Sequence, residues 1–471
     1  MTSSTEASPP GLTEEIVSFI TAADLSDVPE DVMERAKRSL LDGLGLAVAG
    51  SRSEGPQIVR ATLAGYQCAN AEVSVLGTSM RLPARFGAFA NGVQIHADDF
   101  DDTQLAVASD RVYGLLTHPT APVLPVALGL SERAGADGAS LLMSYLVGVE
   151  IATKTAEAIE PRHYDSGFHA TATLGAIGAA AAAIRATGLE GVQAARALGI
   201  AASQAGGVRE HFGTMTKPFH AGRAAESGVF AAELAAQGFT AAPDALEARR
   251  GFFSAAGGGY AVDAIHGALG APWTFGSPGV SIKPHPSGSL THPGMSAFLE
   301  LVRNEDVRPD DVARITVGTN RHMPNALIHH RPTTELQAKF SMEFCMTILL
   351  VERKAGLAEF TDEVVNRDDI RSMIERVDFV VDPEAEAAGY NNMTTNITVL
   401  LKNGQELHTA AAFGRGSPQN PMPDEELIDK FAGCLDWGGL DAARAPEIAD
   451  LVLGLEKQSD VGAVIRLLVA P

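Results

Sequence analysis

The stretch Ala170-Thr-Ala-Thr-Leu-Gly-Ala-Ile-Gly-Ala-Ala-Ala-Ala-Ala183 decides the fold class of this chain. It consists of Ala, Gly and Thr with one leucine and one isoleucine. A helix whose side chains are small on every side is best explained by tight burial among other helices. The stretch therefore predicts a helix over residues 169–187 that lies inside a helical domain.

The segments around this stretch carry helical patterns as well. Leu40, Leu44 and Val48, for example, belong to an apolar stripe at helical spacing. The predicted helices cover residues 13–27, 29–48, 56–65, 84–95, 121–133, 138–159, 190–205, 220–237 and 243–248. With a short strand at 72–76 as the exception, we expect an almost purely helical chain as far as about residue 270.

The sequence pattern changes at Ser277-Pro278-Gly279, which marks a break. Alternating residues and the hairpin signal Asn403-Gly404 predict strands, and further helices lie between them. The strands are expected at residues 280–282, 313–319, 377–381, 397–401 and 406–411, and the helices at 293–303, 335–351 and 361–374. Two more helices, at 423–435 and 446–455, follow. The prediction is a mainly α fold: a large all-α domain from residues 1–275 and 412–471, with a smaller α+β domain inserted at 276–411.

Size, charge and cysteine content limit the function classes. The chain has 471 residues, more than one compact core usually holds, and a formal charge of −22. Nucleic acid and anionic membranes are therefore poor partners, and no uninterrupted apolar run is long enough to span a membrane. The three cysteines, Cys68 among them, form no Cys-x-x-Cys pair, and residues 1–11 resemble no signal peptide and are expected to fray. We expect a cytoplasmic protein.

An acidic run, His96-Ala-Asp-Asp-Phe-Asp-Asp-Thr103, lies between two apolar segments. Its four carboxylates, those of Asp98, Asp99, Asp101 and Asp102, must find donors, cations or water, because an unpaired buried charge is costly. If the run is helical, Asp99 and Thr103 share a face. The alternative is a solvated acidic loop that caps the next helix. The run also matches Asp-Asp-x-x-Asp, a Mg²⁺–diphosphate motif, but the second motif which that chemistry needs is not found.

Two lysines lie in Gly- or Pro-marked stretches that suit an anion. Lys217 precedes the predicted helix, within Gly213-Thr-Met-Thr-Lys-Pro-Phe-His-Ala-Gly222. Lys283 lies in Ser281-Ile-Lys-Pro-His-Pro, where the prolines hold the backbone extended. Either could be a surface lysine in a loop. One such lysine in each domain predicts a cleft between the domains in which carboxylates are clamped.

His118 and His169 each lie next to a predicted helix start. A neutral imidazole can take or give a proton near pH 7, which makes them candidate acid–base groups. The alternative is a hydrogen-bonded structural histidine. His-x-x-x-His spacing for zinc is absent, so no metal is expected.

Taken together, these motifs resemble the MmgE/PrpD family over nearly the whole chain. The shared motifs are Asp99-Phe-Asp-Asp-Thr103, Thr117-His-Pro119, Gly167-Phe-His169, Thr216-Lys-Pro-x-His-Ala-Gly222 and Ile282-Lys-Pro284. The family includes 2-methylcitrate dehydratase, cis-aconitate decarboxylase and iminodisuccinate epimerase. The resemblance implies a large all-α domain, a smaller α+β lid, a homodimer and no metal or organic cofactor.

The resemblance also implies an active site and a reaction class. Its residues would be Asp99, Thr103, His118, His169, Lys217 and Lys283. The decarboxylase has a histidine where this chain has Gly288 and a tyrosine near Ile328, and His285 is expected to bind substrate instead. The implied activity is a cofactor-independent lyase, a dehydratase or decarboxylase, acting on a small di- or tricarboxylate. The alternatives are an epimerase of an amino or imino dicarboxylate, Mg²⁺-dependent diphosphate chemistry, and a binding protein without activity.

The expected mechanism passes through a carbanion-like species. Lys217 and Lys283 would bind carboxylates and stabilise the developing negative charge. His118 or His169 would move the proton, with Asp99 orienting one imidazole and Thr103 holding the substrate. Loss of water, loss of CO₂ and epimerisation share this species, so the motifs do not choose among them.

Overall fold

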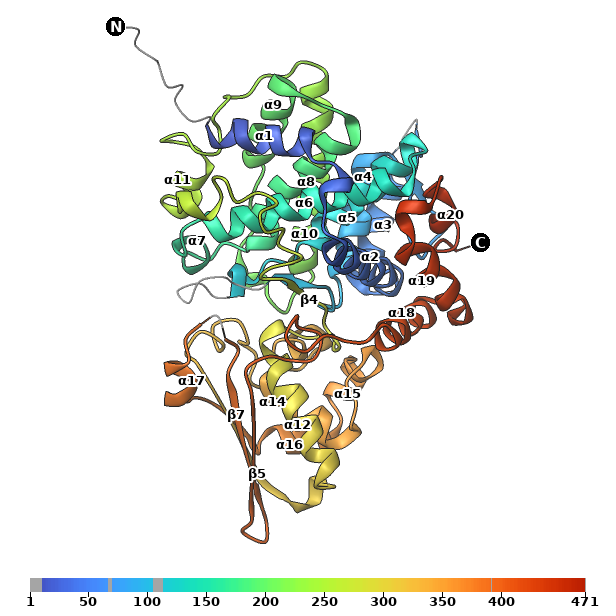
Figure 1. Cartoon of the computed structure of the whole chain (residues 1–471). Coiled ribbons are helices and arrows are strands. Elements are labelled where there is room, and N and C mark those ends of the chain that lie inside the picture. Colours follow the sequence, from blue (N-terminus) through green and yellow to red (C-terminus); the bar gives the residue numbers. More distant parts are fainter. Residues whose placement is uncertain (1–10, 67–69, 105–112, 391, 471) are drawn as a thin grey trace, which may run out of the picture.

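The structure, a computed structural model, describes residues 11–66, 70–104, 113–390 and 392–470. Cys68 lies outside these ranges. The N-terminal residues that are expected to fray also lie outside them, except for Gly11. Most of the described chain is helical, so the predicted mainly α class is confirmed. Figure 1 shows two lobes, which we call the helical lobe (α1–α11 with α18–α20) and the sheet lobe (β5–β8 with α12–α17).

Helix α8 (Ala170–Thr187) lies at the centre of the helical lobe, as its small side chains predict. It packs against α5 (Thr120–Ala134), α6 (Gly138–Ala158), α9 (Gly191–Ala202) and α10 (Thr216–Ala236). A Cβ at Gly178 would lie 2.5 Å from the Cβ of Ala152 on α6, so these two helices approach closely. Among the described helices, α8 alone is long and apolar enough to cross a membrane, but it is buried inside the lobe like a core helix.

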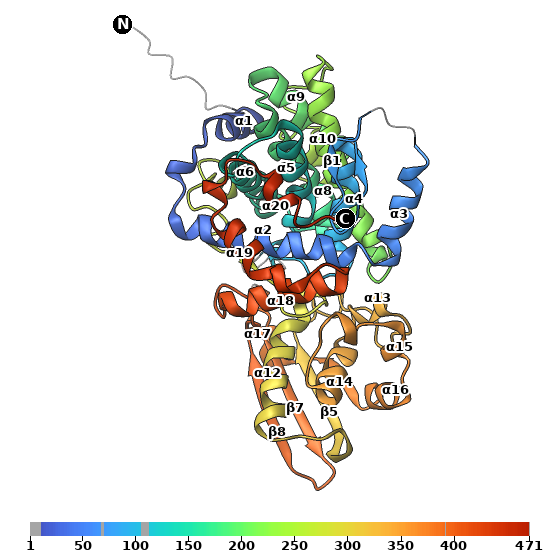
Figure 2. The same ribbon diagram turned by 90° about the vertical axis from the view of Figure 1, so that its right-hand side faces the viewer.

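The two ends of the chain meet in the helical lobe. Helices α18 (Asp424–Gly438) and α19 (Ala445–Leu453) pack against α2 (Glu30–Gly50), as Figures 1 and 2 show. Helix α4 (Ala84–His96) lies between α2 and α10 and contacts both. The end of α4 therefore places the acidic run deep inside the molecule.

The sheet lobe contains a four-stranded sheet in the order β6-β5-β7-β8. Strand β5 (Val312–Thr319) runs parallel to β6 (Val377–Val381) and antiparallel to β7 (Thr395–Leu401). The predicted hairpin joins β7 to β8 (Glu406–Ala411), with Gly404 at φ +90° in its turn. Helix α12 (His292–Asn304) covers β7 and β8, and α14 (Met342–Glu352) contacts α12 and β6.

Several predicted boundaries are wrong. The first helix, α1 (Leu12–Ala22), stops before residue 27, and residues 243–248 form turns, while the unpredicted α11 (Phe252–Gly257) follows. The predicted helix 335–351 is two helices, α13 (Glu335–Ala338) and α14, because the Ser341 hydroxyl accepts a hydrogen bond from the Phe344 N–H and starts a new helix.

The helix predicted at 361–374 is likewise divided, into α15 (Asp362–Val365) and α16 (Asp368–Ile374). Most other predicted elements are present. The remaining elements of four or more residues outside the site are α3 (Glu54–Ala64), α7 (Arg162–Asp165), α17 (Pro383–Ala387) and α20 (Gly462–Ile465), and β1 (Val73–Ser74) pairs with β2 (Arg81–Leu82).

Candidate active site

The acidic run is an irregular segment and not a helix. Asp99 has φ +50°, and Thr103 begins β3 (Thr103–Gln104), so the predicted shared helical face of these two residues is wrong. Strand β3 pairs with β4 (Val280–Ser281), which brings the Lys283 stretch beside the run. All four carboxylates are buried, so the solvated-loop alternative is wrong too, although Asp102 does cap α5 through the Thr120 N–H.

Lys217 and Lys283 converge on one carboxylate, that of Asp99. The Lys217 Nζ lies 2.6 Å from Oδ1, and the Lys283 Nζ lies 3.2 Å from Oδ2 and 2.7 Å from the backbone oxygen. Burial by itself raises the pKa of Asp99, but the two ammonium groups hold it well below its usual range. Burial lowers the pKa of Lys217, and Asp99 opposes this effect. The structure thus joins the two predicted lysines, although Lys217 lies in the first turn of α10 and not in a preceding loop.

Asp101, and not Asp99, holds the imidazoles. Both Asp101 oxygens lie 2.9 Å from Nδ1 of His96, and one lies 3.6 Å from Nδ1 of His118. The Nε2 of His96 accepts from the Lys217 ammonium at 2.7 Å. Burial lowers the pKa of both imidazoles, which favours their neutral forms. His96 and Asp101 were missed as site residues; the signal for His96 was its position where an apolar helix meets the acidic run.

His169 lies behind this cluster and pairs with another histidine. Its ring stacks on His96 with a centroid distance of 5.9 Å, and its Nδ1 lies 3.0 Å from Nδ1 of His220 on α10. Its Nε2 is buried and has no hydrogen-bond partner among the described residues. His220 belongs to the motif Thr216-Lys-Pro-x-His-Ala-Gly222 but was not predicted as a site residue.

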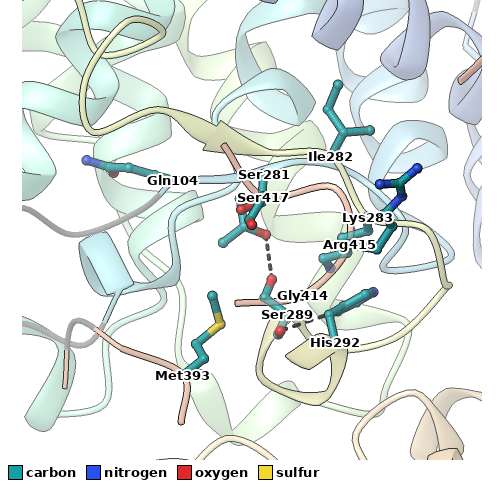
Figure 3. Close-up of a pocket in the computed structure, with 11 residues that line it drawn as sticks. Gln104, Ser281, Ile282, Lys283, Ser289, His292, Met393, Gly414, Arg415 and Ser417 are labelled. Atoms are coloured by element: carbon teal, nitrogen blue, oxygen red, sulfur yellow. Dashed lines mark hydrogen bonds between the residues drawn. The ribbon is translucent and has the colours of Figure 1, made fainter. Parts of the chain in front are cut away.

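Two small cavities adjoin these groups. Asp99, His118, Lys217 and Ser289 are among the residues that line the first, and Thr103, Lys283, Ser289 and His292 line much of the second (Figure 3). Each has a free volume of about 20 Å³, which suits about one water molecule. The hydroxyls of Thr103 and Ser289, 2.5 Å apart, lie between the cavities. As the described residues line them, these cavities are therefore much smaller than a carboxylate of several carbons.

The remaining predicted positions lie apart from the cluster. The Nδ1 of His285 donates to the Ala355 oxygen at 2.8 Å within the sheet lobe, and His285 lines neither cavity. Gly288 lines the first cavity, while Ile328 is 40% exposed. His292, which was not predicted, reaches the second cavity.

The cluster could hold a cation only in competition with the lysines. Ligand atoms of His96, Asp99, Asp101 and His118 lie within 4.8 Å of one another. Two ammonium groups already occupy the Asp99 carboxylate, and their charge opposes a divalent ion. The carboxylates of the Asp-Asp-x-x-Asp motif do not converge on one position either, because Asp98 pairs with Lys339 and Asp102 accepts a hydrogen bond from Thr120.

Comparison with known proteins shows the family of this chain. A model of the MmgE/PrpD N-terminal domain matches residues 14–264, and a model of the C-terminal domain matches residues 285–456. The chain belongs to the MmgE/PrpD family. The family prediction made from the motifs is thereby confirmed.

Curated relatives of this MmgE/PrpD chain are cis-aconitate decarboxylases. The human enzyme is 28% identical over 98% of this chain and 95% of its own length. The Aspergillus terreus enzyme is 26% identical over 98% of this chain and 96% of its own length. A cis-aconitate decarboxylase-like protein of Aspergillus oryzae is 26% identical over 98% of both chains. These names agree with the main functional prediction, a lyase.

Proposed function

We propose that this chain is a cofactor-independent lyase that removes CO₂ or water from a small di- or tricarboxylate, with cis-aconitate as the first substrate to test. The observation that carries the proposal is the convergence of the Lys217 and Lys283 ammonium groups on Asp99 beside a small cavity. Full-length similarity to cis-aconitate decarboxylases supports it.

The two ammonium groups suit a reaction that builds negative charge. Loss of CO₂ leaves an electron pair on carbon, which a neighbouring carboxylate shares as an aci-carboxylate. Fixed cations in a site without bulk water stabilise such charge more strongly than water does. Lys217 and Lys283 take this role, Thr103 holds a substrate carboxylate, and Asp99 keeps the two lysines charged and in place.

The neutral imidazoles supply proton transfer. His118 lines the first cavity with Lys217, and its Nδ1 is held 2.8 Å from the Asp102 backbone oxygen, so its other nitrogen is the one available to substrate. His169, whose Nε2 lacks a partner among the described residues, is the second candidate. A neutral imidazole that gives its N–H proton to a carbanion becomes an imidazolate anion, so another donor must return a proton to the ring in the same event.

We also propose residues 276–411 as an inserted lid domain, and a cytoplasmic homodimer as the working assembly. Lys283 and Ser289 line cavities that are too small for a tricarboxylate, and this supports opening of the sheet lobe during substrate entry. Family membership supports the same organisation. The buried packing of α8 agrees with a soluble globular protein.

The lysine role is tested by Lys217→Ala. Loss of a preorganised donor to developing charge typically costs on the order of 10²–10³ in rate, and we expect that loss in kcat with cis-aconitate. The control is Lys354→Ala, because Lys354 is an exposed lysine that pairs with Glu359. Turnover by Lys217→Ala within about threefold of the unchanged protein would refute the charge-stabilising role.

The reaction type is tested by NMR of the product formed in D₂O. Decarboxylation gives a product with one carbon fewer and one deuterium at the carbon that lost CO₂. Dehydration gives an alkene with no loss of carbon, and epimerisation gives deuterium at the α-carbon with the formula otherwise unchanged. No incorporation and no turnover across the small carboxylates would contradict an enzymatic role.

A further inference from the structure

A lysine from the C-terminal part of the chain reaches the backbone bend that carries Asp99. Lys430 lies on α18, which packs against α2 (Figure 2). Its Nζ donates to the backbone oxygen of Phe100 at 3.0 Å and lies 3.8 Å from the centroid of the Phe100 ring. Lys283 donates to the preceding backbone oxygen, that of Asp99, at 2.7 Å. Two successive carbonyl groups of the bend are therefore each held by a lysine.

A buried carboxylate fixes Lys430 in this position. The Oδ1 atom of Asp42 on α2 lies 2.6 Å from the Lys430 Nζ, and only 6% of the lysine side chain and 3% of the aspartate side chain are exposed. Burial raises the pKa of Asp42 to about 6, although the Lys430 ammonium opposes this effect, so the carboxylate is mostly ionised at neutral pH. Lys430 lines neither of the two cavities, so its effect on a reaction there must pass through the bend.

The Phe100 oxygen controls the direction of Asp101. A peptide group is planar, so the position of its oxygen fixes the plane that joins Phe100 to Asp101. In the same way, Lys283 fixes the plane that joins Asp99 to Phe100. Asp101 in turn holds an imidazole of the site, because its Oδ2 lies 3.6 Å from Nδ1 of His118. A chain of contacts thus runs from Lys430 to His118.

We propose that Lys430 is a positioning residue of the active site, which holds the peptide group between Phe100 and Asp101 so that Asp101 meets His118. Part of the catalytic arrangement would then come from α18, 330 residues along the chain from Phe100. The inference rests on the proposed function, because the placement of His118 affects a rate only if the chain is an enzyme. Misplacement of a reacting group by about 1 Å can cost on the order of 10² in rate.

The deciding variant combines Asp42→Asn with Lys430→Met. Lys430→Met alone leaves the Asp42 carboxylate buried without its counter-charge, which destabilises the fold. The double variant removes both charges together with the donor to the Phe100 oxygen, and we expect kcat with cis-aconitate to fall about 10- to 100-fold. Asp42→Asn alone removes the ion pair but leaves the Lys430 amino group on that oxygen. Its kcat should stay within about threefold of that of the unchanged protein.

Lys154→Met is the matched control. The Lys154 side chain is also mostly buried; its Nζ lies 3.8 Å from the Glu150 carboxylate and donates to the Pro272 backbone oxygen at 2.9 Å. Lys154 lines neither cavity. Its replacement should lower the melting temperature and leave kcat within about threefold. A loss of kcat as large as that of the double variant would overturn the proposal, because general destabilisation would then explain both losses.

A spectroscopic measurement separates this inference from the proposed function, because it needs no turnover. In protein labelled with ¹⁵N-histidine, the ring nitrogen signals of His118, assigned with His118→Gln, report its contact with Asp101. These signals should change in the double variant and stay in place in Asp42→Asn and Lys154→Met. If the unchanged protein turned over no cis-aconitate, the proposed function would fail its first test, and the signals would still decide whether Lys430 positions His118.

Either of two results would overturn the positioning role. One is a kcat of the folded double variant within about threefold of that of Asp42→Asn. The other is a set of His118 signals that the double variant leaves in place. A slow double variant with changed His118 signals, beside a fast Asp42→Asn, would support the assignment of Lys430.

Discussion

At the scale of single residues, Asp102 is a buried carboxyl group that sits just outside the cavities. Its oxygens accept hydrogen bonds from the Thr120 N–H at 3.2 Å and the Thr120 hydroxyl at 2.6 Å, and the hydroxyl also contacts Tyr145. Burial raises the pKa of Asp102 to about 7, against the lowering effect of Thr120, and the nearby Asp101 and Asp42 raise it further. The group therefore titrates near neutral pH.

We predict that Asp102→Asn changes the pH dependence of stability. A carboxyl group whose pKa is higher in the folded state stabilises the fold below its unfolded pKa, and the contribution is lost as pH rises through about 7. The asparagine variant mimics the protonated form and has no such loss. Its melting temperature relative to the unchanged protein should rise between about pH 5 and about pH 8. A constant difference would contradict the assignment; the control is exposed Asp263→Asn.

At this scale, the sequence identified the charged residues more successfully than the residues that they contact. Lys217, Lys283 and His118 stand in Gly- or Pro-marked segments, and such segments are visible in a sequence. The contact of His169 with His220 depends on how α8 packs against α10. The contact of Asp101 with His96 depends on the backbone bend at Asp99. His285 lies only two residues from Lys283, but its ring turns away to Ala355. Sequence proximity does not determine side-chain direction.

At the scale of elements, close helix packing makes glycine necessary on α8. A Cβ at Gly178 would meet Ala152 at 2.5 Å and the Gly148 backbone oxygen at 2.6 Å. By contrast, a Cβ at Gly433 on α18 would meet nothing within 4 Å. Alanine is favoured over glycine in a helix interior by about 0.8–1 kcal/mol. Helix propensity therefore favours alanine at both positions, whereas close packing opposes it only at Gly178.

We predict opposite effects for Gly178→Ala and Gly433→Ala. The first should destabilise the protein by about 1–3 kcal/mol, because overpacking exceeds the gain in propensity. The second should stabilise it by up to about 1 kcal/mol. Thermal unfolding of both variants under one condition measures the difference. A higher melting temperature for Gly178→Ala would show that α6 and α8 have room between them.

The element boundaries show where local patterns fail. The run of Ala, Gly and Thr in α8 predicted its helix well, because burial on every side is written in the side-chain sizes. Residues 335–351 look equally helical, yet α13 ends at Ala338 and Ser341 caps α14. The acidic run follows α4 with helical spacing, but the positive φ of Asp99 breaks it. Lysines from distant segments hold that conformation, and no local pattern reports them.

At the scale of the whole molecule, a buried ion pair joins the two lobes. Lys339, which follows α13, lies 2.9 Å from Oδ1 of Asp98, and only 2% of its surface is exposed. The Ser53 hydroxyl lies 3.3 Å from the same oxygen. Removal of one partner of a buried pair leaves an uncompensated charge, which typically costs about 3–5 kcal/mol.

We predict that Lys339→Met and Asp98→Leu each lower the free energy of unfolding by about 3–5 kcal/mol. The double variant should lose less than the sum of the two single losses. Chemical unfolding of the four proteins gives the coupling free energy. Limited proteolysis should also show faster cleavage in the sheet lobe for Lys339→Met. Additive losses would mean that the pair contributes no coupling between the lobes. The exposed pair Arg466–Asp460 serves as a control, with little coupling expected.

The sequence by itself determined that this chain is mainly helical and that a second region of different pattern follows residue 276, and it singled out two lysines and two histidines as candidate site residues. These properties follow from side-chain size, periodicity and turn chemistry, which are local. The tertiary structure decided which groups meet: both lysines on Asp99, Asp101 against His96, and His169 against His220. The lysine contacts and the His169–His220 contact join segments far apart in the sequence, so no local window contains them. The His96–Asp101 contact spans only five residues, but it needs the backbone bend at Asp99, which the distant lysines hold.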